Sequence, residues 1–469
     1  MKQGDFQPPY RKTLIALLLG AAFLRLLNLG TQSLWFDEII TWLRATLPFG
    51  QFLEFSRTNI VHPPLYFLLM RLVSYLGTDE FTLRFPSACL GIIGVASMYS
   101  LVRKLYGRKV GLVAAALLAV NPFHIWYSQE ARMYALVFLE SLFIGFYFLR
   151  GRGYETWGDG AGLLVFSAFA YVTHYFCLLL PLAQYFYILL KFRETHCLLR
   201  RWVLLQALAA IPIGTWVIFI ALSPEKHMGI GWIPKPGLAD LLLTLVNFGV
   251  TLPGHLDIWS GIAFIPFGIS LAWAAWRNRD RAWWLSWLFI PPAVVLFISL
   301  TTGRHFYADR FFSICLPAFF LMLGWGAGSL PSLRWRRALI ALLLLASLAG
   351  LLRMHLSPLF IREDWRGVCA FLQAQWRAGD LVVVDREAWR IPLHYYGCEF
   401  PVLVKESWEV KPGQRQGRVW IVCRNPYEWP HPPARPREFD ILSDRMIDLG
   451  ESKVRMHRHF IGIEVLLVD

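Results

Sequence analysis

The sequence predicts an all-α polytopic membrane protein with about eleven transmembrane helices, followed by a small α/β domain. Three observations carry this prediction. The 469 residues are 56% hydrophobic and only 17% charged, a composition that excludes an ordinary soluble protein. Long apolar runs recur as far as residue 356. Beyond Ser357 they stop and charges become frequent, so we expect domains at residues 1–356 and 357–469.

Eleven apolar runs are predicted to span the membrane, although several are shorter than the usual ~20 residues. The first lacks a small-residue cleavage site and is therefore interpreted as a retained span, not a signal peptide. The runs lie near residues 13–29, 85–102, 110–122, 134–149, 161–172, 176–190, 202–222, 258–276, 283–300, 311–329 and 338–356.

Basic residues predict the orientation of these spans. With eleven spans, six basic clusters fall on one side, which the positive-inside rule makes cytoplasmic. One further apolar stretch, Leu65 to Leu76, is then a helix along the outer membrane surface, because a span there would turn the later clusters outward. The clusters are Arg11 and Lys12; Arg103, Lys104, Arg108 and Lys109; Arg150 and Arg152; Lys191, Arg193, Arg200 and Arg201; Arg277, Arg279 and Arg281; and Arg334, Arg336 and Arg337.

The last 110 or so residues have the pattern of a small α/β domain. After Ser357 there are sixteen Lys and Arg and sixteen Asp and Glu, so the whole net charge of +14 belongs to the membrane region. A neutral tail argues against nucleic acid as a partner. A helix is expected from Asp364, and Cys369, Cys398 and Cys423 allow one disulfide that spacing cannot assign. Short strands are expected at residues 381–384, 401–404, 419–422 and 465–468.

Asp37 and Glu38 lie just beyond the first apolar run. A carboxylate beside a bilayer is costly to place, so such an acidic pair indicates a functional role. A His and several Arg residues then recur at the ends of the next runs, which predicts a catalytic site at the outer membrane surface. The segments are Trp35-Phe36-Asp37-Glu38, His62-Pro63-Pro64-Leu65-Tyr66, Leu83-Arg84-Phe85-Pro86, Leu105-Tyr106-Gly107, Asn121-Pro122-Phe123 and Ser128-Gln129-Glu130-Ala131-Arg132-Met133-Tyr134.

In this order, the segments resemble the bacterial branch of the GT-C glycosyltransferases, family 39, similar to protein O-mannosyltransferases and lipid A aminoarabinose transferases. The resemblance is dense over residues 14–190 and weaker at Asp309-Arg310-Phe311 and Glu363-Asp364-Trp365-Arg366. It implies a polyprenyl-phosphate-linked sugar as donor, transfer on the extracytoplasmic side of the inner membrane, and inversion at the anomeric carbon.

Such a reaction needs a base for the acceptor hydroxyl and cations for the phosphate, because a lipid phosphate is already a stable leaving group. Asp37 is the candidate general base; the alternative is that it caps the helix that follows, with Glu38 in the first turn. Glu38 is a second catalytic candidate, with a basic partner or a divalent metal as further possibilities. No metal-ligand set is readable and no cofactor is assigned.

Arg84, Arg132, Arg310 and His62 are predicted to hold the donor phosphate. For Arg84 the alternative is a side chain extended to lipid headgroups, for Arg132 a local salt bridge with Glu130, and for His62 a turn residue. The candidates for substrate contact are Glu130, Tyr66 and Tyr134.

A transporter or flippase of the cell envelope is the alternative function. It predicts inverted repeats and broken spans at matching positions, and the sequence shows neither. The sequence also lacks nucleotide-binding loops, so an outward-facing enzyme must take an activated substrate from the membrane. The acceptor, a protein, lipid or glycan, is not readable, and residues 223–257 are expected to form a loop that contributes to specificity.

Overall fold

The computed structural model describes residues 8–150, 156–223, 233–251, 257–404, 418–424 and 454–468. It divides into two compact units. The first comprises Met1–Leu29, Arg44–Gly77 and Thr82–Leu356, and the second Gly30–Leu43, Thr78–Phe81 and Ser357–Asp469. The second unit therefore includes the segment with Asp37 and Glu38, which the sequence analysis had placed in the membrane domain. The proposed domain boundary after residue 356 stays a prediction.

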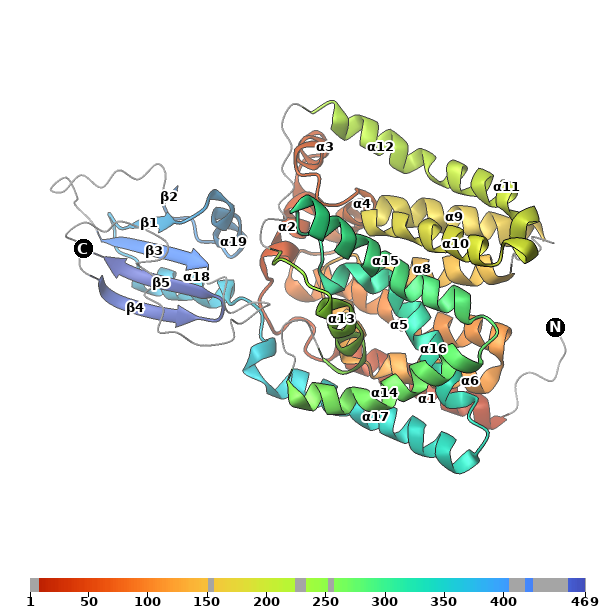
Figure 1. The fold of residues 1–469 in the computed structure, drawn as a ribbon. Coiled ribbons are helices and arrows are strands. Elements are labelled where there is room, and N and C mark those ends of the chain that lie inside the picture. Colours follow the sequence, from red (N-terminus) through yellow and green to blue (C-terminus); the bar gives the residue numbers. More distant parts are fainter. Residues whose placement is uncertain are drawn as a thin grey trace. The chain divides into compact units, whose positions relative to one another are not determined.

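The first unit is helical (Figure 1). Its first helices are α1 (Pro8–Leu26), α3 (Phe49–Thr58), α4 (Leu65–Ser74), α5 (Glu80–Tyr106), α6 (Arg108–Ala119), α7 (Pro122–Ser128), α8 (Tyr134–Arg150) and α9 (Trp157–Thr173). They continue with η1 (Tyr175–Leu178), α10 (Leu179–Leu190), α11 (Phe192–Ala209), α12 (Ile211–Ala221), α13 (Ala239–Val250), α14 (Ile258–Arg277), α15 (Arg281–Thr302), η2 (Asp309–Cys315), α16 (Leu316–Gly328) and α17 (Leu333–Leu356). Helix α2 (Phe36–Thr46) contributes its first eight residues to the second unit.

Each of the eleven apolar runs lies mainly on helix. By length and composition, five of the described helices can cross a membrane, or up to seven if each bent pair is one span. One pair, α6 and α7, bends by 63° because Asn121 caps α7 and Pro122 occupies its first position. The count of eleven spans remains a prediction.

Two expectations for connecting segments have different outcomes. Leu65–Ser74 is a helix of ten residues, too short to span a membrane, as expected. Its position on the membrane surface stays a prediction. Residues 223–257 were expected to be loop, and this was wrong for Ala239–Val250, which forms α13. Twelve residues of mixed apolar and polar character are too short to register as a span, but they are long enough to pack as a helix.

The second unit contains a five-stranded mixed sheet in the order β2-β1-β3-β5-β4, with β3 between β1 and β5 (Figure 1). Strands β1 and β2 run parallel, as do β1 and β3, whereas β5 is antiparallel to both β3 and β4. Val383, Ile421 and Leu466 form part of its buried core. The elements are η3 (Pro358–Phe360), α18 (Trp365–Gln375), β1 (Leu381–Val384), η4 (Glu387–Trp389), α19 (Arg390–Tyr395), β2 (Val402–Val404), β3 (Val419–Arg424), β4 (Val454–Phe460) and β5 (Ile463–Val468).

The predicted α/β character of this region is confirmed. All four expected strands are present, and α18 begins after Asp364, whose carboxylate accepts a hydrogen bond from the Gly367 N–H at 2.9 Å. Strand β4 was missed, because its Arg and His residues give no apolar run. Cys369 and Cys398 form a disulfide with Cα atoms 5.8 Å apart, whereas Cys423 is free and buried.

Candidate active site

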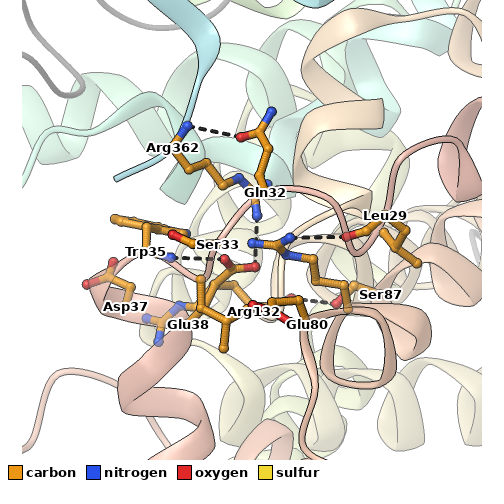
Figure 2. Close-up of polar contacts among 12 residues, drawn as sticks. Leu29, Gln32, Ser33, Trp35, Asp37, Glu38, Glu80, Ser87, Arg132 and Arg362 are labelled. Carbon is orange, nitrogen blue, oxygen red and sulfur yellow. Dashed lines mark hydrogen bonds and ion pairs between the residues drawn. The ribbon is translucent and has the colours of Figure 1, made fainter. Parts of the chain in front are cut away.

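The first turn of α2 carries the two predicted catalytic acids. The helix begins at Phe36, so Asp37 and Glu38 both lie within its first turn, where the helix dipole stabilises negative charge. Glu38 is completely buried. One of its carboxylate oxygens accepts a hydrogen bond from the Trp35 N–H at 3.3 Å, and the other forms an ion pair with Arg362 at 2.9 Å (Figure 2).

These contacts revise the capping alternative. The side chain that returns to the backbone before α2 belongs to Glu38, the reciprocal half of a capping box, while Asp37 is the second helical residue and is half-buried. Glu38 also has the basic partner that the sequence analysis considered for it, Arg362. Neighbouring helical residues point about 100° apart, so Asp37 faces a different direction from Glu38.

The first unit contains a separate group of buried cations, which we call the basic cluster: Arg44, His62, Arg132, His174 and Arg310. Each side chain is less than a tenth exposed. The rings of His62 and His174 lie 5.1 Å apart, and the Phe311 ring lies within 6.4 Å of both.

Two guanidinium groups of the basic cluster share one aromatic neighbour. The guanidinium carbon of Arg44 lies 4.3 Å from the centre of the Phe67 ring, and that of Arg132 lies 5.9 Å from the same ring. Arg310 contacts the Phe311 ring at 5.7 Å. Flat aromatic surfaces hold guanidinium groups in place and leave their N–H groups available at the edges.

Several donors of the basic cluster are buried without a protein partner. Arg44 donates one N–H to the Asn59 carbonyl at 2.9 Å, but its Nε and Nη1 have no hydrogen-bond partner among the described residues. The Nδ1 atom of His174 accepts from the Phe176 N–H at 3.2 Å, which leaves the proton on Nε2, also without a partner in the described part of the chain. The Nδ1 atom of His62 is likewise buried without a hydrogen-bond partner among the described residues.

The positive charges affect one another. Burial, followed by the charges of Arg132, His174, Arg44 and Arg310, lowers the pKa of His62 well below its ordinary value. Burial and the same Arg132 and Arg310 lower the pKa of His174 to about 3. Both imidazoles are therefore neutral at pH 7, while Arg44, whose pKa burial and Arg132 lower to about 9, remains charged. An anion entering the cluster would meet positive charge together with neutral N–H donors.

The remaining predicted residues support this region in different ways. The Tyr66 hydroxyl and the Ser87 hydroxyl lie 3.0 Å apart. The Ser87 hydroxyl donates to the Arg132 carbonyl at 3.1 Å (Figure 2). Tyr66 is thus connected to the backbone of Arg132 through the Ser87 hydroxyl. The Tyr134 ring lies 6.3 Å from the His174 ring.

Glu130 and Arg84 are both buried, in different settings. The Glu130 carbonyl accepts from the Arg132 N–H at 2.7 Å, in the tight segment between α7 and α8. Arg84 donates to the Leu29 carbonyl at 3.1 Å and is not among the groups whose charges act on His62. This contact binds Arg84 to the protein backbone, so the lipid-headgroup alternative does not describe it.

Arg44 and His174 were not predicted from the sequence. Both lie outside the ordered segments on which the sequence-based prediction relied. Arg44 follows Asp37 by seven residues, and His174 falls between two apolar runs, so the available signal was an ionisable side chain enclosed by apolar sequence. Within the described ranges, no group of three or more His, Cys, Asp or Glu residues could hold a metal ion. A metal role for Glu38 stays an untested prediction.

Solved structures share this fold. ArnT from Cupriavidus metallidurans bound to undecaprenyl phosphate superimposes with a TM-score of 0.61 at 13% identity, covering 97% of this chain and 97% of that chain. The archaeal oligosaccharyltransferase AglB from Archaeoglobus fulgidus, in complex with an inhibitory peptide and a dolichol-phosphate, gives 0.52 at 12% identity, covering 90% and 70%. The mycobacterial arabinofuranosyltransferase AftD gives 0.51 at 15% identity, covering 88% of this chain and 35% of its own.

The sequence model of the dolichyl-phosphate-mannose-protein mannosyltransferase family matches residues 61–219. Over these residues the chain is similar to that family of membrane glycosyltransferases. The resemblance to the GT-C glycosyltransferases is thereby confirmed, and with it the prediction of an enzyme of this class. Three members of the glycosyltransferase's basic cluster, His62, Arg132 and His174, lie inside the matched stretch. No curated protein matches the glycosyltransferase.

Proposed function

We propose that the protein transfers a sugar from a polyprenyl-phosphate donor to an acceptor hydroxyl. The observation that carries this proposal is the basic cluster: three Arg side chains and two neutral His side chains, all buried, with side-chain nitrogens of Arg44, His62 and His174 that have no hydrogen-bond partner among the described residues. Burying charge is expensive unless a partner neutralises it. A phosphate group, with several acceptor oxygens and negative charge, meets both requirements.

In the proposed reaction the basic cluster holds the phosphate while the acceptor oxygen forms its bond to the anomeric carbon of the sugar. The bond from that carbon to the phosphate oxygen breaks, and polyprenyl phosphate leaves as an anion stabilised by Arg44, Arg132 and Arg310. Asp37 is proposed to take the proton of the acceptor hydroxyl as general base. Attack opposite the leaving phosphate inverts the anomeric configuration.

The orientation belongs to the same proposal: eleven spans, with the active site and the C-terminal region on the extracytoplasmic side of the plasma membrane. The Cys369–Cys398 disulfide supports an oxidising location for the second unit, because such bonds persist outside the cytosol. A single cysteine introduced near Arg150 should be shielded from impermeant thiol reagents on intact cells, and one near Lys411, which lies outside the described residues, should react. The reverse pattern at both positions would contradict the orientation.

The experiment for the function uses purified protein in detergent and a panel of undecaprenyl-phosphate-linked mannose, arabinose and aminoarabinose. Release of undecaprenyl phosphate in the presence of extracted envelope lipids and proteins is the expected result. A transporter would move such lipids without breaking the sugar–phosphate bond. Absence of cleavage for all three donors, together with no binding of undecaprenyl phosphate, would exclude the proposal.

A further inference from the structure

The C-terminal part of the second unit holds the first turn of α2 through buried charges. The Arg362 guanidinium pairs with the Glu38 carboxylate at 2.9 Å, and the side chains are 4% and 0% exposed. The Arg362 N–H also donates to the Gln32 side-chain oxygen at 3.0 Å (Figure 2). Arg362 thus contacts the chain at two points: its backbone N–H binds Gln32, which precedes α2, and its guanidinium binds Glu38 in the first turn of α2.

Glu363 makes a second attachment at the start of α2. Its Oε2 accepts the Phe36 N–H at 3.1 Å and the Trp365 indole N–H at 2.8 Å. Its Oε1 pairs with Arg424, from the end of β3, at 2.5 Å. The Phe36 N–H belongs to the first helical residue and has no acceptor within the helix, so a carboxylate there supplies a hydrogen bond and complements the helix dipole.

Packing restricts the Glu363 side chain from other directions. Gly462, in the turn between β4 and β5, has φ +72°, and a Cβ atom there would lie 3.1 Å from Glu363 Cγ. The adjacent Asp364 N–H donates to the Ile461 carbonyl at 3.0 Å. The hairpin turn therefore packs against the Glu363 side chain, whose carboxylate contacts the Phe36 N–H and Arg424.

Aromatic rings complete the attachment. The Phe36 ring lies 4.8 Å from the Trp389 ring in an edge-to-face arrangement. The Arg424 guanidinium lies 5.3 Å from the centre of the same Trp389 ring, and the Trp365 ring lies 6.0 Å from it. The residues on both sides of Asp37, Phe36 and Glu38, are consequently fixed by contacts to residues 362–424.

We propose that Glu363 and Arg362 are positioning residues that orient Asp37. A buried ion pair contributes little net stability compared with apolar packing of the same volume, so these charges are better explained by the geometry that they impose. A displacement of about 1 Å at a reacting group can lower a rate by about 100-fold. The inference rests on the proposed role of Asp37 as general base, and it gives the Glu363-Asp364-Trp365-Arg366 segment a function in the reaction.

The first test is Glu363→Gln in the full-length protein, measured with whichever donor of the panel is turned over. Gln keeps the size of the side chain and one acceptor oxygen, but it removes the charge that pairs with Arg424. We expect kcat to fall about tenfold, equivalent to about 1.4 kcal/mol, with KM for the donor within about twofold. The matched control is Glu387→Gln, which breaks the exposed Glu387–Arg390 pair of the same unit and should leave kcat unchanged.

The second test is a double-mutant cycle with Asp37→Asn. If Glu363 acts through Asp37, the Gln substitution should lower kcat no further once the base is absent. Equal fractional losses in both backgrounds, or a rise in KM with unchanged kcat, would overturn the positioning role while leaving the base intact. Full activity of Asp37→Asn itself would remove the proposed base, and the inference with it.

A third variant covers the case in which Glu363→Gln does not fold. Arg362→Lys keeps the charge opposite Glu38 but changes the reach and the planar shape of the donor. It should lower kcat at unchanged KM, again only when Asp37 is present. A wild-type kcat in a folded Arg362→Lys protein would contradict the proposal.

Discussion

Arg44 offers the sharpest test of the basic cluster, because its proposed role and a purely structural role predict opposite results. The side chain is 2% exposed, donates one N–H to the Asn59 carbonyl at 2.9 Å and lies 4.3 Å from the centre of the Phe67 ring. Its Nε and Nη1 have no partner in the residues that the structure describes. Arg44→Gln removes the charge and retains a polar side chain.

The effect on stability can be estimated from these contacts. Burial and Arg132 lower the pKa of Arg44 from 12.5 to about 9, which disfavours the charged form by on the order of 5 kcal/mol. The hydrogen bond and the ring contact offset this by about 1.5–3 and about 1–2 kcal/mol. Gln removes the desolvation penalty together with both favourable contacts, so the free energy of unfolding should change by no more than about 2.5 kcal/mol.

The effect on phosphate binding should be large. One charge-assisted contact contributes about 1.5–3 kcal/mol, so Arg44→Gln should raise the Kd for undecaprenyl phosphate by about 10- to 150-fold. Undecaprenol, which lacks the phosphate, should bind the variant and the wild type equally. The control is Arg57→Gln, which removes a half-exposed Arg paired with Glu54 on α3 and should leave both quantities unchanged. Unaltered affinity for undecaprenyl phosphate, or a loss of several kcal/mol of stability without loss of affinity, would refute the reasoning.

Three further predictions follow from the same contacts. Asp37→Asn should lower the transfer rate by about 10²–10⁴-fold with little change in melting temperature, whereas near-normal activity would leave Asp37 a structural role only. Because the folded pKa values of His62 and His174 lie below the unfolded value of 6.5, stability should be intact above pH 6.5 and fall as the pH falls below it. Thermal unfolding from pH 6.5 to 5 should show a loss of about 1.6 kcal/mol from His174 and a further loss from His62, and variants with Gln at both positions should lose this dependence. Cys398→Ser opens the Cys369–Cys398 bridge, which closes a loop of 29 residues, and should lower stability by about 3–4 kcal/mol at most; an unchanged melting temperature, or free thiols in the purified protein by mass spectrometry, would contradict it.

Local patterns predicted much of this structure. The strands at residues 381–384 and 419–422 are apolar β-branched runs, and burial between neighbouring strands is what such runs favour. Arg84, Arg132, Arg310 and His62 were predicted to hold one phosphate. The last three lie in the basic cluster, whereas Arg84 donates to the Leu29 carbonyl and lies outside it. The apolar runs are helical because a buried or membrane-embedded backbone must satisfy its own hydrogen bonds.

What the sequence concealed are contacts between distant positions. Arg44 and His174 join the basic cluster from segments 130 residues apart, and neither belongs to a repeated spacing. Glu363 acts on Phe36 from 327 positions further along the chain. Strand β4 lacks an apolar alternation because His457 and His459 contact Glu464, a buried carboxylate of β5. In each case the feature depends on a contact with another segment of the chain, which no local pattern indicates.

The contacts of the two adjacent acids separate their roles. A general base must present an oxygen to the hydroxyl of an incoming acceptor, and Glu38 is fully buried with one oxygen on Arg362 and the other on the Trp35 N–H. Asp37 is half-buried and points about 100° away around the helix axis. These contacts favour the proposal that Glu38 fixes the turn while Asp37 serves as the base for the acceptor. The same division explains why an acidic pair occurs there: fixing one carboxylate by an ion pair sets the direction of its neighbour.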